Sequence, residues 1–156
     1  MHALSPESRQ AHRILLVDDE ADILESLQEL LQAAIPGLDV DVAPSGEDAL
    51  AMLQKGAYDV LVSDFKMPGM NGMDLLREAR KVAPGTPRVL MTAFPDLQIA
   101  IEAINDARIE NFFTKPLDPE EVVDVLEAML QHRKANLNRD RAFARAMDLA
   151  RRKEEP

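Results

Sequence analysis

The sequence predicts an α/β domain built on a parallel sheet with helices on both of its faces. The main observation is that short apolar runs alternate with longer amphipathic segments, and this pattern repeats five times along the chain. Runs that are apolar throughout indicate strands buried on both faces, as in parallel sheets covered by helices. Turn and capping residues separate each strand from the helix after it.

The five strands are predicted from short runs rich in apolar residues and bounded by polar or turn residues. In chain order they are expected at residues 13–17, 38–43, 58–63, 88–92 and 109–113. The first, RILLV, is apolar along its length. The second, LDVDVA, alternates apolar and acidic residues, so one of its faces is expected to be exposed.

The helices are predicted from apolar residues spaced three and four apart, and from their start and stop signals. The first helix is predicted from one apolar face formed by Ile23, Leu27, Leu30, Leu31 and Ala34. The expected first turns of the other four helices follow Ser45, Asn71, Asp96 and Asp118. The clearest start is the segment DPEE at 118–121, with Asp as N-cap, Pro at the first position and Glu at the third. Pro36 and Gly37 end the first helix.

The composition restricts the classes of protein. At 156 residues, the chain is long enough for one domain with a sizeable core. Cysteine is absent, which excludes disulfides, thiol catalysis and Cys-ligated metal. No apolar run approaches the roughly 18 residues of a membrane span, and the N-terminus lacks the apolar centre of a signal peptide. We therefore expect a cytoplasmic protein that binds no membrane.

The charge divides the chain into two parts. Residues 132–156 contain eight Lys/Arg and four Asp/Glu, a net charge of +4, whereas residues 1–131 contain ten and 24, a net charge of −14. An acidic domain repels phosphates, so no nucleic acid is expected as a partner. We expect an extended or disordered N-terminus at 1–12, a domain at 13–131 and a basic helical tail at 132–156.

Polar residues collect where the predicted strands end. These residues are Asp18, Asp19, Glu20, Asp64, Thr92 and Lys115. Ligands of open parallel sheets bind at this edge, where the strand order reverses. Carboxylates brought together repel one another unless a cation lies between them, and oxygen ligands without histidine suit Mg²⁺. With a lysine and a hydroxyl nearby, such a site suits phosphoryl transfer, and one carboxylate could be the nucleophile.

Four motifs together resemble the receiver domain of two-component response regulators, with its chemotaxis-type fold. They are VDDE (17–20), VSDFKMPGMNG (62–72), MTA (91–93) and FFTKP (112–116). The resemblance covers about residues 13–131 and implies a doubly wound, flavodoxin-like sheet with the strand order 2-1-3-4-5.

The resemblance also implies roles for individual residues. Asp64 is the implied phosphoacceptor, phosphorylated by a histidine kinase or a phosphotransfer protein. The implied Mg²⁺ ligands are Asp18, Asp19, Asp64 and the backbone carbonyl of Lys66. Thr92 is the implied switch hydroxyl, Phe112 the switch aromatic and Lys115 the phosphate-binding lysine, with a cis bond before Pro116.

The implied function is a phosphorylation switch with no separate effector domain in this chain. Phosphorylation of Asp64 would draw Thr92 and Lys115 inward, Phe112 would follow, and binding of an unknown downstream protein would change. A homodimer through the face of the fourth helix, fifth strand and fifth helix, or through the tail, is also implied. Three residues depart from the family pattern. Phe112 stands where tyrosine is common, Arg108 follows Asp106-Ala107 where many relatives have Gly-Ala, and Lys66 is expected to alter the lifetime of the phosphoryl group.

Other interpretations remain for the whole chain. A phosphatase of the haloacid dehalogenase type also uses an aspartate after a strand with Mg²⁺, but Lys66 stands where its second acid would be. The chain could instead be an unphosphorylated docking module, or the receiver fragment of a longer regulator with an output domain. The tail is a solvated terminal helix, a dimerising or signalling extension of the fifth helix, or, least favoured, a DNA-binding output.

Simpler interpretations also exist for single residues. Residues 18–20 would serve as acids in the first turn of a helix, and Asp64 as a turn residue. Thr92 would reflect strand propensity, and Phe112 would be a core residue.

Overall fold

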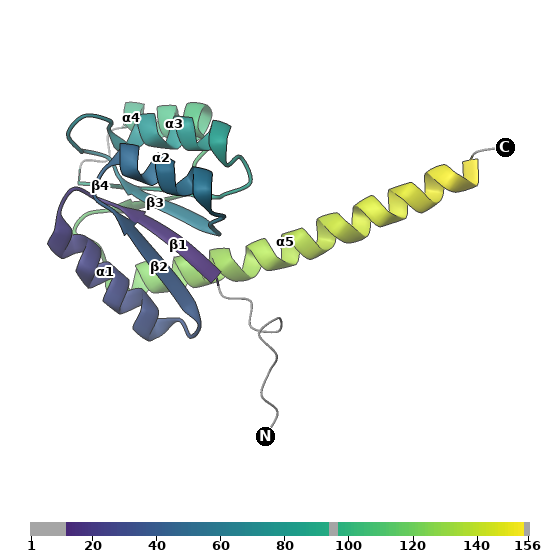
Figure 1. Cartoon of the computed structure of the whole chain (residues 1–156), viewed down its shortest axis with the longest axis horizontal. Coiled ribbons are helices and arrows are strands. Elements are labelled where there is room, and N and C mark those ends of the chain that lie inside the picture. Colours follow the sequence, from purple (N-terminus) through teal and green to yellow (C-terminus); the bar gives the residue numbers. More distant parts are fainter. Residues whose placement is uncertain (1–11, 94–96, 155–156) are drawn as a thin grey trace, which may run out of the picture.

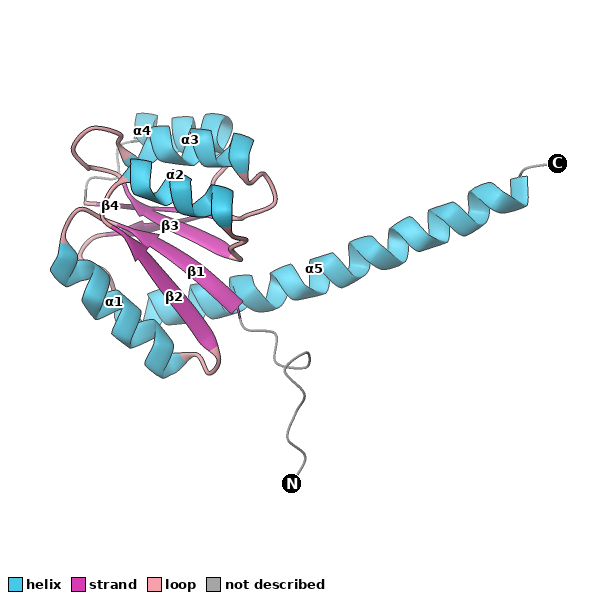
Figure 2. Ribbon diagram, viewed as in Figure 1, coloured by secondary structure: helices cyan, strands magenta, loops and turns pink. Residues whose placement is uncertain are grey.

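The computed structural model describes residues 12–93 and 97–154 and contains one five-stranded parallel sheet (Figure 2). The strands are β1 (His12–Val17), β2 (Leu38–Ala43), β3 (Val60–Asp64), β4 (Arg88–Thr92) and β5 (Asn111–Thr114). Their order in the sheet is β2-β1-β3-β4-β5. The doubly wound architecture is therefore confirmed, and the strand order reverses between β1 and β3.

Helices cover both faces of this sheet (Figure 1). They are α1 (Ala21–Ala34), α2 (Gly46–Lys55), α3 (Gly72–Val82), α4 (Leu97–Glu102) and α5 (Pro119–Glu154), with a π-helix, η1 (Ala103–Ala107), directly after α4. The helices α1 and α5 pack on one face, and α2, α3, α4 and η1 pack on the other.

Each central strand contributes to both cores because neighbouring side chains point to opposite faces. In β1, Ile14 and Leu16 join the core under α1 and α5, whereas Leu15 and Val17 join the core under α2 and α3. All four side chains are at most 1% exposed. Burying each one contributes roughly 1.5–3 kcal/mol, so the sheet is a rigid support for the residues at its carboxyl ends.

Side chains cap three helices close to the predicted starts. Ser45 Oγ accepts a hydrogen bond from Asp48 N, and Asn71 Oδ1 accepts one from Asp74 N. Asp118 Oδ1 accepts from Glu120 N, at the second helical position. Asp96, the expected cap of the fourth helix, lies outside the described residues.

The segment before β5 differs from the sequence prediction. A single α-helix was expected up to residue 107, but its last five residues form η1. Arg108 then adopts a left-handed conformation, with φ of 49°, and Ile109 N still donates to Ala103 O. The strand predicted at 109–113 therefore begins only at Asn111. The third strand likewise begins at Val60 rather than at residue 58, and it includes Asp64 as its last residue.

The last helix is one continuous element of 36 residues. Val122, Leu126 and Leu130 are buried against the sheet and α1. The helix then continues without a break past residue 131, where the domain was expected to end, and projects away from the domain (Figure 1). No helix within the described part of the chain is long and apolar enough to cross a membrane.

Candidate functional site

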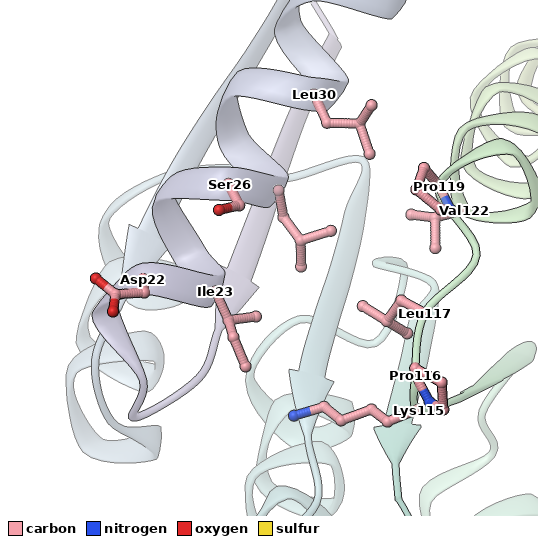
Figure 3. A pocket seen from close by; sticks show the side chains of 10 residues that line it. Asp22, Ile23, Ser26, Leu30, Lys115, Pro116, Leu117, Pro119 and Val122 are labelled. Atoms are coloured by element: carbon pink, nitrogen blue, oxygen red, sulfur yellow. The ribbon is translucent and has the colours of Figure 1, made fainter.

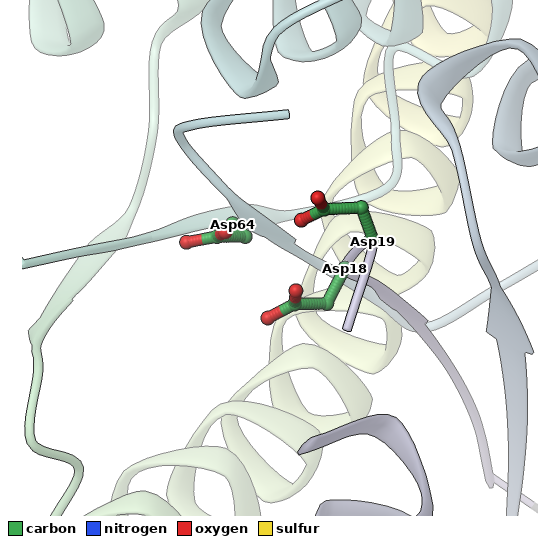
Figure 4. A group of neighbouring side chains, drawn as sticks. All are labelled: Asp18, Asp19 and Asp64. Atoms are coloured by element: carbon green, nitrogen blue, oxygen red, sulfur yellow. The ribbon is translucent and has the colours of Figure 1, made fainter. Parts of the chain in front are cut away.

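The point where the strand order reverses brings three carboxylates together. Asp64 ends β3, and Asp18 and Asp19 directly follow the neighbouring strand β1. The pairing of Val17 with Ser63 places the carboxyl ends of these two strands at the same level. One carboxylate oxygen from each aspartate lies within 4.8 Å of the other two (Figure 4). The predicted cluster is therefore present.

Asp18 is the most deeply buried member of this cluster, with 0% exposure. Its Oδ1 accepts a hydrogen bond of 2.9 Å from Glu20 N, which fixes the loop before α1. Burial raises the pKa of Asp18, and the charge of Asp64 raises it further, although Glu20 N and Lys115 oppose this shift. The ionised form of Asp18 is therefore less favourable than that of an exposed aspartate.

Lys115 supplies positive charge from the loop after β5. Its Nζ lies 3.0 Å from Asp64 Oδ1 and 3.4 Å from Asp18 Oδ2. Burial alone lowers the pKa of Lys115, but its hydrogen bond to Asp64 and the charges of both aspartates raise it overall. The lysine is therefore held as a cation between the two acids. The bond between Lys115 and Pro116 is cis, as predicted.

A cavity of about 410 Å³ opens over the cluster. Its lining includes Asp19, Asp64, Lys66, Thr92, Ile99 and Lys115. Thr92, the last residue of β4, is only 3% exposed. Lys66 is exposed beside the cavity, as expected for a side chain that overhangs the site.

Phe112 is not among the residues that line this cavity. It is half-buried and packs against the core under α2, α3 and α4, whereas its neighbour Phe113 is buried in the opposite core. Phe112 thus packs at the edge of this core, and its role as the switch aromatic stays a prediction.

Gly72 positions the site, although sequence analysis assigned it no role beyond the loop motif. A β-carbon at this glycine would collide with the backbone carbonyl of Asp64. Gly72 N donates a hydrogen bond of 2.8 Å to Phe65 O, so the start of α3 packs directly on the end of β3. Glu47 on α2 holds the same loop, because its Oε1 accepts from Met70 N. Only the three-dimensional structure shows these contacts.

A second cavity, of about 550 Å³, lies between α1 and the start of α5 and opens next to Lys115 (Figure 3). Its lining is mostly apolar and includes Ile23, Leu27, Leu30, Leu117 and Val122. Sequence analysis did not identify this groove, because apolar spacing alone does not distinguish residues that line a groove from residues in the core.

The donor set fits Mg²⁺. Three carboxylates converge, two of them contact one ammonium group, and their oxygens are hard ligands without histidine or cysteine among them. Asp18, Asp19 and Asp64 would hold the ion, and Lys66, whose backbone carbonyl is the further ligand implied by the resemblance, lines the cavity.

Comparison with known proteins places this geometry in context. A family model described as the response regulator receiver domain matches residues 14–127. The transcriptional regulatory protein ZraR of Salmonella typhimurium is 35% identical over 119 residues, which are 76% of this chain and 26% of ZraR. The C4-dicarboxylate transport transcriptional regulatory protein DctD of Rhizobium meliloti is 30% identical over 140 residues, which are 90% of this chain and 30% of DctD. The chain thus spans about a quarter to a third of the length of these relatives.

Solved structures show the same fold. The signal receiver domain of an HD domain-containing protein from Pseudomonas fluorescens superposes with a TM-score of 0.76 at 30% identity, covering 89% of this chain and 98% of that one. A CheY-like receiver domain protein from Methanospirillum hungatei gives a TM-score of 0.76 at 27% identity, covering 81% of this chain and 99% of that one.

Proposed function

The chain belongs to the response regulator receiver family, and from this premise we propose that it is a Mg²⁺-dependent phosphorylation switch with Asp64 as phosphoacceptor. The observation that supports this proposal most strongly is the position of Asp64. It ends a buried strand, 6% exposed, within reach of two further carboxylates and of the Lys115 ammonium group. This position keeps the carboxylate fixed by the sheet and open to the cavity.

The proposed reaction transfers a phosphoryl group from a phosphohistidine of a kinase or phosphotransfer protein. A carboxylate oxygen of Asp64 attacks phosphorus, the N–P bond breaks, and the histidine leaves as a neutral imidazole after taking up a proton. Lys115 neutralises charge on the transferred group, and Thr92 donates a hydrogen bond to it. Bound Mg²⁺ would supply further charge neutralisation at the phosphoryl oxygens.

Uptake from a small donor tests the site without the unknown kinase. We expect the wild-type protein to gain the mass of one phosphoryl group from acetyl phosphate with Mg²⁺, and Asp64→Asn to gain none. Asp39→Asn is the matched control, because Asp39 is an exposed aspartate on β2 away from the cluster. Equal uptake by the Asp64→Asn variant would refute the assignment.

We place the docking site of the phosphodonor at the apolar groove between α1 and the start of α5. Its opening beside Lys115 brings any helix seated there close to Asp64. With a donor protein that phosphorylates the wild type, Ile23→Glu is expected to slow transfer at least tenfold and to leave uptake from acetyl phosphate unchanged. Ile104→Glu, an exposed position on η1, is the control. Slower uptake from acetyl phosphate by Ile23→Glu would point to damage at the site instead.

The output of the switch is proposed to be a change in partner binding. Phosphorylation of Asp64 would move Thr92 and Lys115 inward, and Phe112 would follow, which biases the face of α4, β5 and α5 toward a second state. The downstream partner would be a protein in the cytoplasm, or a second copy of this chain bound through that face or through the projecting part of α5. The matched relatives are several times longer, so an output domain in the same polypeptide is the alternative route.

We propose that the chain catalyses only its own phosphorylation and dephosphorylation and is not an enzyme for other substrates. Phosphatases of the haloacid dehalogenase type use a second acid two residues after the nucleophile, and Lys66 occupies that position. We expect no turnover of p-nitrophenyl phosphate. We also expect Lys66→Ala to change the decay rate of the phosphorylated protein, because the lysine overhangs the cavity that attacking water must enter. An unchanged decay rate would remove this role of Lys66.

A further inference from the structure

We propose that Asp59 and Arg133 form a joint that holds the projecting part of α5 as a rigid arm in a fixed direction relative to the domain. The joint lies at the end of the sheet opposite to Asp64. It does not depend on phosphorylation of Asp64.

The joint lies just after the part of α5 that packs on the sheet. Leu126, Met129 and Leu130 are buried at 9% exposure or less. Arg133 follows less than one turn later. Its Nε lies 3.3 Å from Asp59 Oδ1, and its Nη1 donates a hydrogen bond to Gly85 O in the loop between α3 and β4.

Asp59 is itself fixed to the sheet. Its Oδ2 accepts a hydrogen bond of 2.9 Å from Arg13 N, its N donates one of 2.7 Å to Arg13 O, and His12 Nδ1 lies 3.8 Å from its carboxylate. The carboxylate therefore cannot follow Arg133 if the helix moves. The guanidinium group is planar, and its two bonds run to separate segments, so they resist both tilting and rotation of the helix. The side chains of Arg133 and Asp59 are only 22% and 29% exposed, which reduces screening by salt.

A small change of angle at this joint would move the end of the helix by a large distance. From residue 134 to Glu154 the helix continues for 21 residues, or about 30 Å at the rise of an α-helix. A tilt of about 20° at the base would move the tip by about 10 Å. Contacts at Arg133 that limit the tilt at the base would therefore strongly limit the movement of residues near the tip.

Distances between spin labels test the proposal in the full chain. The protein has no cysteine, so two labels can be placed by Gln54→Cys on α2 and Ala150→Cys near the tip, both at exposed positions. Labelled protein is diluted with unlabelled protein so that only distances within one molecule are measured. We expect a narrow distribution for the parent and at least a twofold broader one for Arg133→Gln.

Two controls separate a lost joint from other effects. His132→Gln changes the exposed neighbour of Arg133 on the same helix and should leave the distribution narrow. A second label pair within the arm, Gln131→Cys with Ala146→Cys, reports whether the helix itself has melted. Asp59→Asn should broaden the first distribution as Arg133→Gln does, and the double variant should add little to either.

The outcomes are distinct. A broad domain-to-tip distribution together with a narrow distribution within the arm supports the joint. A domain-to-tip distribution that stays narrow in Arg133→Gln would overturn it. Broadening of both distributions would also overturn it, because Arg133 would then stabilise the helix rather than set its direction.

Discussion

The two ends of the sheet carry charged groups that are balanced in opposite ways. Toward the amino ends of the strands, two carboxylates each face an arginine. Asp41 Oδ2 lies 2.8 Å from Arg13 Nη2, and Asp59 pairs with Arg133. At the carboxyl ends, Asp18, Asp19 and Asp64 lie together, and the ammonium group of Lys115 contacts only Asp18 and Asp64 among them. We refer to these as the amino-end network (Arg13, Asp41, Tyr58, Asp59 and Arg133) and the carboxyl-end cluster (Asp18, Asp19, Asp64 and Lys115).

The pKa shifts show what this difference means. The hydrogen bond from Tyr58 and the proximity of Arg13 lower the pKa of Asp41, so its ionised form stabilises the fold. Burial and the charge of Asp64 raise the pKa of Asp18, so its ionised form costs stability. In the amino-end network two carboxylates each pair with an arginine, whereas in the carboxyl-end cluster three carboxylates lie beside one ammonium group.

The largest effect is expected from a change in backbone packing at the carboxyl-end cluster. Gly72→Ala would force a methyl group into the backbone carbonyl of Asp64, so the start of α3 must move away from β3. We expect the free energy of unfolding to fall by about 3 kcal/mol, the upper range for overpacking, and phosphate uptake to be lost. Urea denaturation and mass spectrometry after incubation with acetyl phosphate measure the two effects.

Gly85→Ala is the control for this substitution, because a β-carbon there meets nothing within 4 Å. Its stability should match that of the parent. If Gly72→Ala retained full uptake, the geometry of the cluster would not depend on this close approach.

Arg88, a buried cation near the amino ends of the strands, is expected to affect the stability of the fold but not the affinity for Mg²⁺. Arg88 is 6% exposed and donates hydrogen bonds to the backbone oxygens of Thr86, Ala107 and Arg108. Arg88→Met would leave these carbonyls without donors, at a cost of about 2 kcal/mol. Urea denaturation should show this loss, and affinity for Mg²⁺ should be unchanged.

Arg108→Met removes an exposed arginine from the same segment and is expected to change stability by less than about 0.5 kcal/mol. A loss of Mg²⁺ affinity in Arg88→Met would show that the two ends of the sheet are coupled.

Tyr58→Phe tests the balance within the amino-end network. The variant keeps the ring under Arg13 but loses the hydrogen bond of 2.6 Å to Asp41 Oδ2, at an expected cost of about 1.5 kcal/mol near neutral pH. Burial and Asp41 raise the pKa of Tyr58 to about 12. Its contribution is therefore complete below the unfolded value of about 10 and is lost as the pH rises toward 12.

The stability contribution of Asp41 depends on pH in the opposite direction from that of Tyr58. Because the pKa of Asp41 is lowered, its contribution is present above the unfolded value of about 4 and is lost as the pH falls below it. The stability difference between wild type and Tyr58→Phe should therefore be largest between about pH 5 and 9. Tyr58 is the only tyrosine and tryptophan is absent, so absorbance reports its titration directly. Asp41→Asn should lower the pKa of Tyr58, and an unchanged pKa would contradict this account.

The sequence predicted the carboxyl-end cluster far better than the amino-end network. Asp18, Asp64 and Lys115 follow strands that apolar runs reveal, and parallel strands necessarily end at the same edge. Charge repulsion among the acids then pointed to a cation. The family resemblance, rather than periodicity, supplied the strand order and the roles of Thr92 and Lys66.

No comparable sequence pattern predicts the contacts of the amino-end network. Arg133 lies 74 residues from Asp59 in the sequence, and no pattern of residue types relates them. The π-helix before Arg108 was missed because apolar spacing alone does not distinguish it from the end of an α-helix. Gly72 was visible only as part of a turn, since its close approach depends on how α3 packs.

The smallest effect on stability is expected for Asp19→Asn. This variant tests the comparison most sharply, because the stability difference from the wild type should change sign when Mg²⁺ is added. Asp19 is exposed and contributes one of the three clustered carboxylates. Without Mg²⁺, Asp19→Asn removes repulsion and should raise the free energy of unfolding by about 0.5 kcal/mol. With saturating Mg²⁺, the wild type should be the more stable protein, because it binds the ion more tightly and binding to the folded state adds to stability.

Thermal denaturation across a Mg²⁺ titration should show the stability curves of the wild type and Asp19→Asn crossing. Glu25→Gln, which changes an exposed acid one turn into α1, should follow the wild type throughout. If Asp19→Asn were the less stable protein at every Mg²⁺ concentration, the carboxylates would not be in excess, and the carboxyl-end cluster would be as balanced as the amino-end network.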